Sequence, residues 1–96
     1  MPRFALAVSQ YMAWWMAELY HPPVKRSVEI AGHKTSISLE PLFWELLKLA
    51  AQQDGLPVNA LVARVDAARL GATTPPGLGS ALRLWLAARY AAGMGQ

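Results

Sequence analysis

The sequence predicts a mainly α-helical domain with one short β-strand per chain, completed by a second copy of the same chain. Two-residue alternation of polar and apolar side chains over residues 34–39 predicts the strand, and apolar residues at helical spacing predict three helices after it. The chain has 96 residues and no cysteine, so neither disulfides nor thiolate-bound metals stabilise so small a core. A partner subunit is the remaining source of stability, and we expect a homodimer.

An N-terminal extension is predicted for residues 1–23, and the main domain for residues 24–93. Phe4 to Tyr20 is predicted as a helix with a broad apolar face, ended by the pair of prolines at 22 and 23 because proline does not continue a helix. The apolar stretch is shorter than the roughly 20 residues of a spanning helix, and it has no charged start or cleavage site typical of a signal peptide. We therefore predict a cytoplasmic protein without a membrane segment.

The predicted strand follows a bend at residues 31–33, where Gly32 supplies unusual backbone angles. One face of the strand carries Thr35, Ile37 and Leu39, and the other carries Lys34, Ser36 and Ser38. The strand has no partner in its own chain unless the alternating residues 28–30 fold back on it. Because an isolated strand leaves backbone groups unpaired, we expect it to pair with the same strand of a second copy, which gives an intermolecular antiparallel ribbon.

Each of the three predicted helices has its own boundary signals. The first begins at Glu40-Pro41, since proline is tolerated in a first turn, and ends at Gly55, a left-handed cap. The second runs from about Val58 to Leu70, and the third from about Ser80 to Ala92. Their buried stripes are predicted as Leu42, Phe43, Leu46, Leu47 and Ala50; Val58, Leu61, Val62, Val65 and Ala68; and Leu78, Ala81, Leu82, Trp85 and Leu86.

The polar strand face indicates an anionic ligand. The formal net charge of +3 fits such a partner without requiring one. A two-stranded ribbon fits the DNA major groove, where the Lys34 ammonium can donate to guanine and the two serines can donate or accept. The free N–H groups of Val58 and Asn59, at the start of a predicted helix, are suited to phosphate. By themselves, these features are also typical of a solvent-exposed strand face and of an ordinary helix start that faces water.

Residues 26–40 resemble a bacterial branch of the ribbon-helix-helix family, which carries a Gly-His-x-Thr-Ser-Ile-x-Leu-Glu signature at the positions of 32–40 here. The similarity continues through Phe43-Trp44, Gly55, residues 59–62, Asp66 and residues 80–83. The resemblance implies an intertwined, ribbon-helix-helix homodimer that binds DNA, and it places the third helix outside the minimal unit.

The resemblance also implies roles for individual residues. Lys34, Ser36 and Ser38 are the base-facing positions, and the Val58 and Asn59 amides hold the DNA backbone. Many relatives have serine or threonine where this chain has Pro57, which offers neither a hydroxyl nor an amide. Lys25 and Arg26, beside the ribbon, are predicted to neutralise phosphates.

The predicted function is therefore a dimeric DNA-binding regulator of transcription, acting as a repressor. No spacing of residues indicates a metal site, a cofactor or a catalytic nucleophile, so a non-enzyme is expected. The alternative is a protein-interaction adaptor or an antitoxin-like module. In that alternative the aromatic segment 4–20, with Trp14 and Trp15, binds a partner protein.

Overall fold

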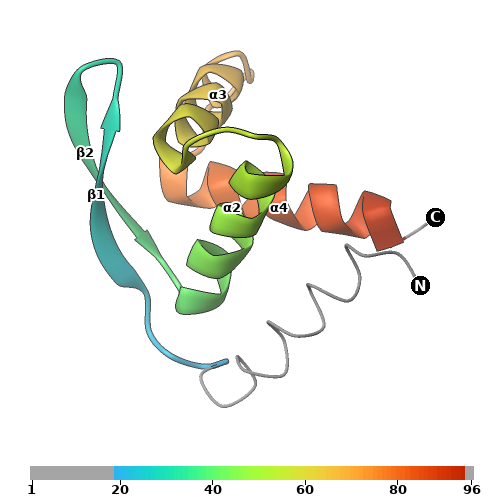
Figure 1. The fold of residues 1–96 in the computed structure, drawn as a ribbon. Coiled ribbons are helices and arrows are strands. Elements are labelled where there is room, and N and C mark those ends of the chain that lie inside the picture. Colours follow the sequence, from blue (N-terminus) through green and yellow to red (C-terminus); the bar gives the residue numbers. More distant parts are fainter. Residues whose placement is uncertain (1–18, 95–96) are drawn as a thin grey trace.

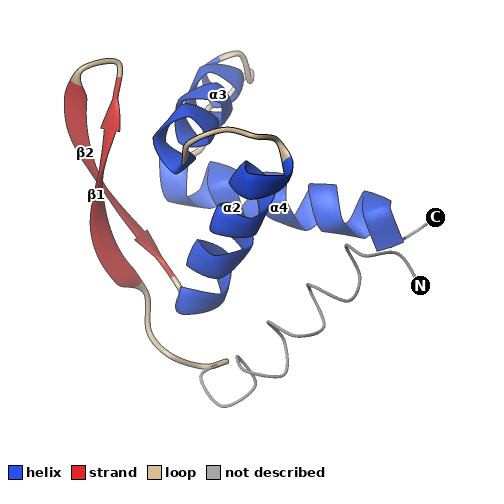
Figure 2. Ribbon diagram, in the orientation of Figure 1, coloured by secondary structure: helices blue, strands red, loops and turns tan. Residues whose placement is uncertain are grey.

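The computed structural model describes residues 19–94, in which two antiparallel strands precede three helices (Figure 1). The elements are β1 (Val24–Ile30), β2 (His33–Leu39), α2 (Pro41–Gln53), α3 (Val58–Leu70) and α4 (Leu78–Met94). Figure 2 shows the hairpin along one side of the helices, so one face of its two strands is left without a helical layer. The helix predicted for Phe4–Tyr20 lies outside the described residues, except that Leu19 and Tyr20 form a turn. None of the described helices is long and apolar enough to cross a membrane.

The prediction of one strand per chain, paired only with a second copy, is wrong. β2 pairs with β1 of the same chain in a two-stranded antiparallel sheet, from Val24 opposite Leu39 to Ile30 opposite His33. The alternation at residues 28–30, which allowed such a fold-back, belongs to a strand that extends to Val24. The ribbon is therefore built within one chain.

A two-residue turn at Ala31 and Gly32 closes the hairpin. Both residues have positive φ, +50° for Ala31 and +81° for Gly32, which is the pattern of a type I′ turn. The twist of this turn matches the right-handed twist of paired strands, so it fixes the register at the first pair, Ile30 opposite His33. The predicted bend is confirmed at these two residues, whereas His33 is already the first residue of β2.

The apolar face of the hairpin packs on the helices. Ile37 and Leu39 are buried in one core with residues of all three helices, and Val24, Val28 and Ile30 pack against that core. The largest fully buried side chains are Leu39, Leu47, Leu61, Leu82, Leu86 and Val62. We call this side of the hairpin the inner face.

Trp44 fixes the open end of the hairpin to α2. Its ring is buried, and its Nε1 donates a hydrogen bond of 2.9 Å to the carbonyl oxygen of Val24. The guanidinium of Arg26 lies 5.1 Å from the centroid of the same ring. A cation over an indole face is attractive, so β1 is held at its base by both a hydrogen bond and a stacking contact.

The helix boundaries largely follow their predicted signals. α2 begins at Pro41 and ends in a Schellman motif, in which Leu56 N–H donates to Ala51 and Gly55, at φ +66°, donates to Gln52. α3 has the predicted bounds. α4 begins at Leu78, two residues before the predicted start at Ser80.

Most residues of the predicted buried stripes are buried or packed against the core, whereas Leu42 is partly exposed outside that cluster and Ala68 is exposed. Ala68 lines an open groove between α3 and α4, so no neighbouring element covers it. Trp44, Leu49 and Ala51 are additional buried residues of α2.

The first turn of α4 covers part of the free edge of β2. Arg83 donates from Nη2 to the carbonyl oxygen of Ser38 at 3.1 Å and from Nε to Oε1 of Glu40 at 2.8 Å. The backbone of α4 is so close that a Cβ built on Gly79 would lie 3.5 Å from the same Ser38 oxygen. Beyond the Ser38 carbonyl, this edge of β2 has no hydrogen-bonded strand neighbour in the described chain.

The other end of α4 is joined to the end of α2. Arg89 donates to both carboxylate oxygens of Asp54, at 3.0 and 2.8 Å, and to Oε1 of Gln53 at 3.2 Å. These hydrogen bonds from Arg89 hold the pKa of Asp54 below its ordinary value of 3.8. The bidentate ion pair between Arg89 and Asp54 therefore stabilises the fold at pH values above 3.8. This stabilisation is lost as the pH falls and the carboxylate is protonated.

The turn predicts the effect of a single substitution. Replacing Ala31 with Asn should stabilise the protein by about 1 kcal/mol, because asparagine tolerates positive φ far better than alanine. The melting temperature of Ala31→Asn should rise by several degrees, measured by circular dichroism. Ala31→Val is the control and should lower it, since a β-branched side chain is strained at this φ. An equal response of the two variants would contradict the turn.

The Arg89–Asp54 pair predicts a pH dependence. Because the folded-state pKa of Asp54 is depressed, the wild-type protein should lose part of its stability as pH falls from 5 through that depressed pKa. Arg89→Met keeps the apolar stem but removes the partner, so its melting temperature should depend less on pH over the same interval. Thermal melts at pH 7, 5, 4 and 3 measure the two slopes. Parallel curves would show that the pair contributes nothing in solution.

Candidate nucleic-acid interface

The side of the hairpin that points away from the helices carries a group of six polar side chains. They are Lys25, Ser27 and Glu29 on β1 and Lys34, Ser36 and Ser38 on β2, and all six residues are exposed. The register sets them opposite one another in three pairs, Lys25 with Ser38, Ser27 with Ser36, and Glu29 with Lys34. Directly opposed residues share one side of a sheet, so the six form one surface, which we call the outer face.

The outer face exists because the inner face is buried. Residues alternate between the two sides of a strand, so the burial of Ile37 and Leu39 turns Ser36 and Ser38 outward. The structure thus places Lys34, Ser36 and Ser38 together on one exposed face, with Lys25 beside them. Arg26 is on the inner face, where it lies over Trp44.

The outer side chains are available to a ligand. Within residues 19–94, none of the six side chains makes a hydrogen bond or an ion pair with another residue. Two lysines and one glutamate give the face a net positive charge, and three hydroxyls add groups that both donate and accept. The arrangement can bind a surface that presents hydrogen-bonding groups and negative charge.

The start of α3 lies apart from the outer face. α3 packs against β1 from the helical side, and its N-cap is Pro57, which makes no side-chain capping hydrogen bond. The Pro57 carbonyl accepts from the N–H groups of Ala60 and Leu61. In the described chain, the N–H groups of Val58 and Asn59 have no acceptor, as expected for the first turn of a helix.

Two outer-face residues, Ser27 and Glu29, were not predicted as site residues. The signal for them was present in the alternation of residues 27–30 together with the bend at Gly32. A two-residue turn there sets these positions opposite Ser36 and Lys34. These two residues were not predicted because residues 24–30 were not recognised as a strand of the same sheet.

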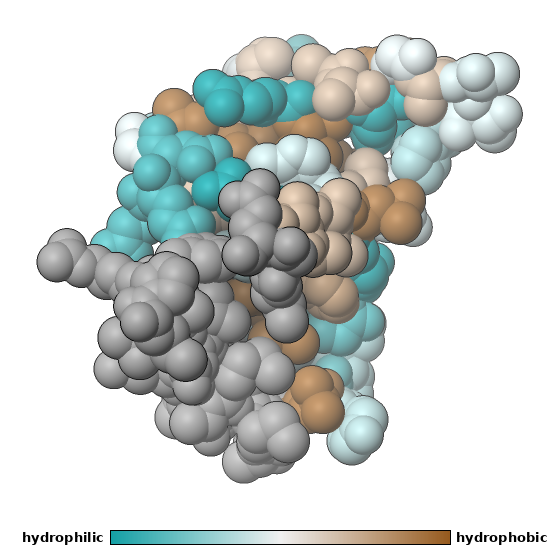
Figure 3. Space-filling view, turned by 90° about the vertical axis from the view of Figure 1, so that its right-hand side faces the viewer, coloured by the Kyte–Doolittle hydropathy of each residue, from teal (hydrophilic) through white to brown (hydrophobic). Residues whose placement is uncertain are grey.

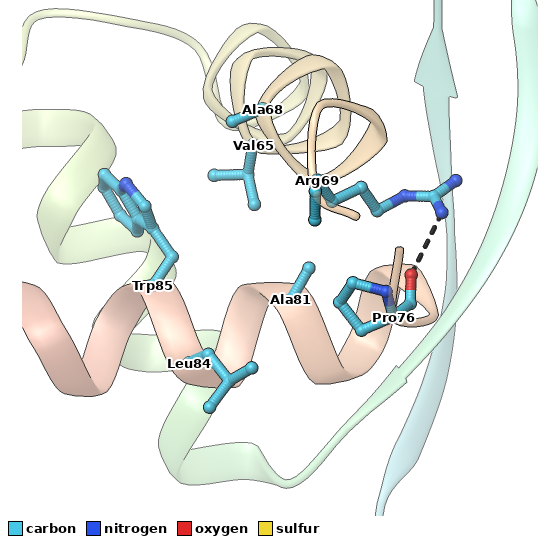
Figure 4. Close-up of a pocket in the computed structure, with 8 residues that line it drawn as sticks. Val65, Ala68, Arg69, Pro76, Ala81, Leu84 and Trp85 are labelled. Atoms are coloured by element: carbon cyan, nitrogen blue, oxygen red, sulfur yellow. Dashed lines mark hydrogen bonds between the residues drawn. The ribbon is translucent and has the colours of Figure 1, made fainter. Parts of the chain in front are cut away.

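A second surface feature lies between α3 and α4. It is an open groove of about 340 Å³, lined mainly by apolar side chains. Figure 4 shows Val65 and Ala68 of α3 facing Ala81 and Trp85 of α4, with Arg69 reaching sideways to a hydrogen bond with the Pro76 carbonyl. Arg69 is also paired with Asp66 at 2.7 Å, so its charge is already matched. No charged side chain that lines the groove is therefore left unpaired.

The outer face is the stronger candidate for a ligand-binding surface. In the view from the side away from the hairpin, the coloured atoms mix brown apolar residues with teal polar ones and form no continuous polar surface (Figure 3). The described residues contain no group of three or more metal-ligating side chains.

Comparison with known proteins identifies the family. No curated protein and no solved structure matches the chain. Residues 23–90, which include both strands and nearly all of the three helices, match the ribbon-helix-helix domain family. This family typically comprises DNA-binding regulators and antitoxins, is generally non-enzymatic, and generally binds DNA as dimers. With more than half of its length matched, the chain belongs to the ribbon-helix-helix domain family.

Proposed function

We propose that this protein is a homodimeric DNA-binding regulator of transcription, which inserts the β1–β2 hairpin into the major groove. The main support for this proposal is the outer face, which presents six exposed polar side chains on a two-stranded antiparallel ribbon. A protein bound in the major groove excludes other proteins from the same stretch of DNA. We therefore propose that this regulator represses transcription.

The dimensions of the hairpin fit the groove. Paired strands lie about 4.8 Å apart, and the major groove of B-DNA is about 12 Å wide and admits a two-stranded ribbon. The three helices pack on the inner face, so they do not obstruct the approach of the outer face. In this arrangement Lys34, Ser36 and Ser38 face the bases.

Contacts to phosphate hold the ribbon in place. We assign this role to Lys25, at the open end of the outer face, and to the N–H groups of Val58 and Asn59, which lie at the positive end of the α3 dipole. We assign the same role to Arg26 because it is charged and exposed. Its guanidinium is stacked on Trp44 in the structure, so it does not belong to the outer face. These contacts give affinity without sequence preference.

The proposed dimer differs from the strand-sharing dimer expected from the sequence. Each protomer brings a complete ribbon of its own, so two copies present two hairpins. A two-fold dimer of this kind recognises two inverted half-sites, one helical turn or a multiple of it apart. Proteins of this family generally bind DNA as dimers, which supports a dimer here.

Substitutions on the outer face should weaken DNA binding without unfolding the protein. Lys34→Ala with Ser36→Ala removes donors to base edges, each worth about 1–3 kcal/mol of discrimination when the contact is good. Lys25→Ala should lower the slope of log K against log salt by about 0.9, the value for one phosphate contact. Fluorescence anisotropy with labelled duplexes selected from a random pool, at two or more salt concentrations, measures both effects.

Lys48→Ala is the matched control, because Lys48 is an exposed lysine on α2, where it pairs with Glu45. It should leave base preference and affinity close to those of the wild type. Failure of the wild-type protein to bind any duplex at low salt would contradict the proposal. So would a stoichiometric protein partner captured by a chain that shows no DNA binding.

A further inference from the structure

We propose that Glu29 and Lys34 together recognise one G·C base pair, with Lys34 on the guanine and Glu29 on the cytosine. This inference rests on the proposed insertion of the hairpin into the major groove. It adds a specificity-determining residue from β1, the strand whose pairing within the chain was not expected.

The register makes the two residues immediate neighbours. Glu29 and Lys34 face each other directly across the strands, where Cβ atoms are about 4.5–5.5 Å apart. They form the last outer-face pair before the turn, and theirs is the one opposed pair of that face with opposite charges. Both are exposed, and within the described chain neither forms an ion pair. A donor and an acceptor therefore stand side by side, both free to bind a third group.

A G·C base pair offers the complementary pattern. In the major groove guanine presents two adjacent acceptors, N7 and O6, and cytosine presents the N4 amino donor next to them. The ammonium of Lys34 can donate to both guanine acceptors while the carboxylate of Glu29 accepts from the cytosine amino group. An A·T pair places the adenine N6 amino donor opposite the lysine and the thymine O4 acceptor opposite the carboxylate, so both contacts are lost. The Ser27–Ser36 pair next to them discriminates less, because a hydroxyl both donates and accepts.

Neither the fold nor phosphate attraction accounts for Glu29. Its side chain is outside the core and makes no hydrogen bond or ion pair with another described residue, so no such contact holds it on the hairpin. A carboxylate is repelled by phosphates, so Glu29 lowers affinity for DNA unless it meets a hydrogen-bond donor on a base edge. Cytosine N4 is the donor that lies beside the acceptors of a lysine-bound guanine.

The test is selection from a pool of randomised duplexes followed by anisotropy on the selected sites, with the full chain. The wild-type protein should prefer G·C over A·T about tenfold at one position of each half-site, which corresponds to about 1.4 kcal/mol. Glu29→Ala and Lys34→Ala should each reduce the preference at that position to about twofold. Glu29→Gln should retain much of the preference, because its amide oxygen still accepts, while binding every duplex more tightly. Glu45→Gln, on α2, is the charge-matched control and should leave the preference unchanged.

The two Glu29 variants separate recognition from simple repulsion. If Glu29→Ala and Glu29→Gln both tighten binding to all duplexes and leave the base preference unchanged, the inference is overturned while DNA binding stands. If the wild-type protein binds no member of the pool, the proposed function fails and the inference fails with it.

Discussion

The hairpin turn at Ala31 and Gly32 determines the pairing of the whole sheet and, through it, which side chains are buried. A type I′ turn fixes Ile30 opposite His33, and every later pair of the sheet follows from that first one. A shift of one residue would move Ile37 and Leu39 out of the core and the serines into it. The same turn therefore sets the buried face, the polar face and the pairing of Glu29 with Lys34.

The free edge of β2 is covered in part by α4. Arg83 binds the Ser38 carbonyl and Glu40 together, and the hydrogen bond from Arg83 lowers the pKa of Glu40. At the base of the hairpin, Trp44 holds the Val24 carbonyl. Proteins commonly cover strand edges in this way to avoid unwanted pairing. The pairing of β1 with β2 gives one chain a two-stranded ribbon, with one polar face left free of helices.

Local signals predicted much of this fold. The alternation at residues 34–39 gave both faces of β2, and Pro41, Gly55 and the apolar spacing gave the bounds of α2 and α3. β1 was missed because Arg26 occupies an inner-face position and hides the two-residue pattern. Arg26 is accommodated there by Trp44, a contact across eighteen positions that no local pattern reveals. Ser27 and Glu29 were missed as site residues for the same reason, since their place on the outer face follows only from β1.

The origin of the ribbon is most directly measured by cross-linking a pair of engineered cysteines. The chain has no cysteine, so Ser27→Cys with Ser36→Cys introduces one thiol on each strand at directly opposed outer-face positions. Opposed residues of neighbouring strands have Cβ atoms close enough for a disulfide after mild oxidation. An intrachain hairpin predicts a disulfide within each chain, seen as a monomer on a non-reducing gel and confirmed by peptide mass. A covalent dimer joined from residue 27 of one chain to residue 36 of the other would contradict it.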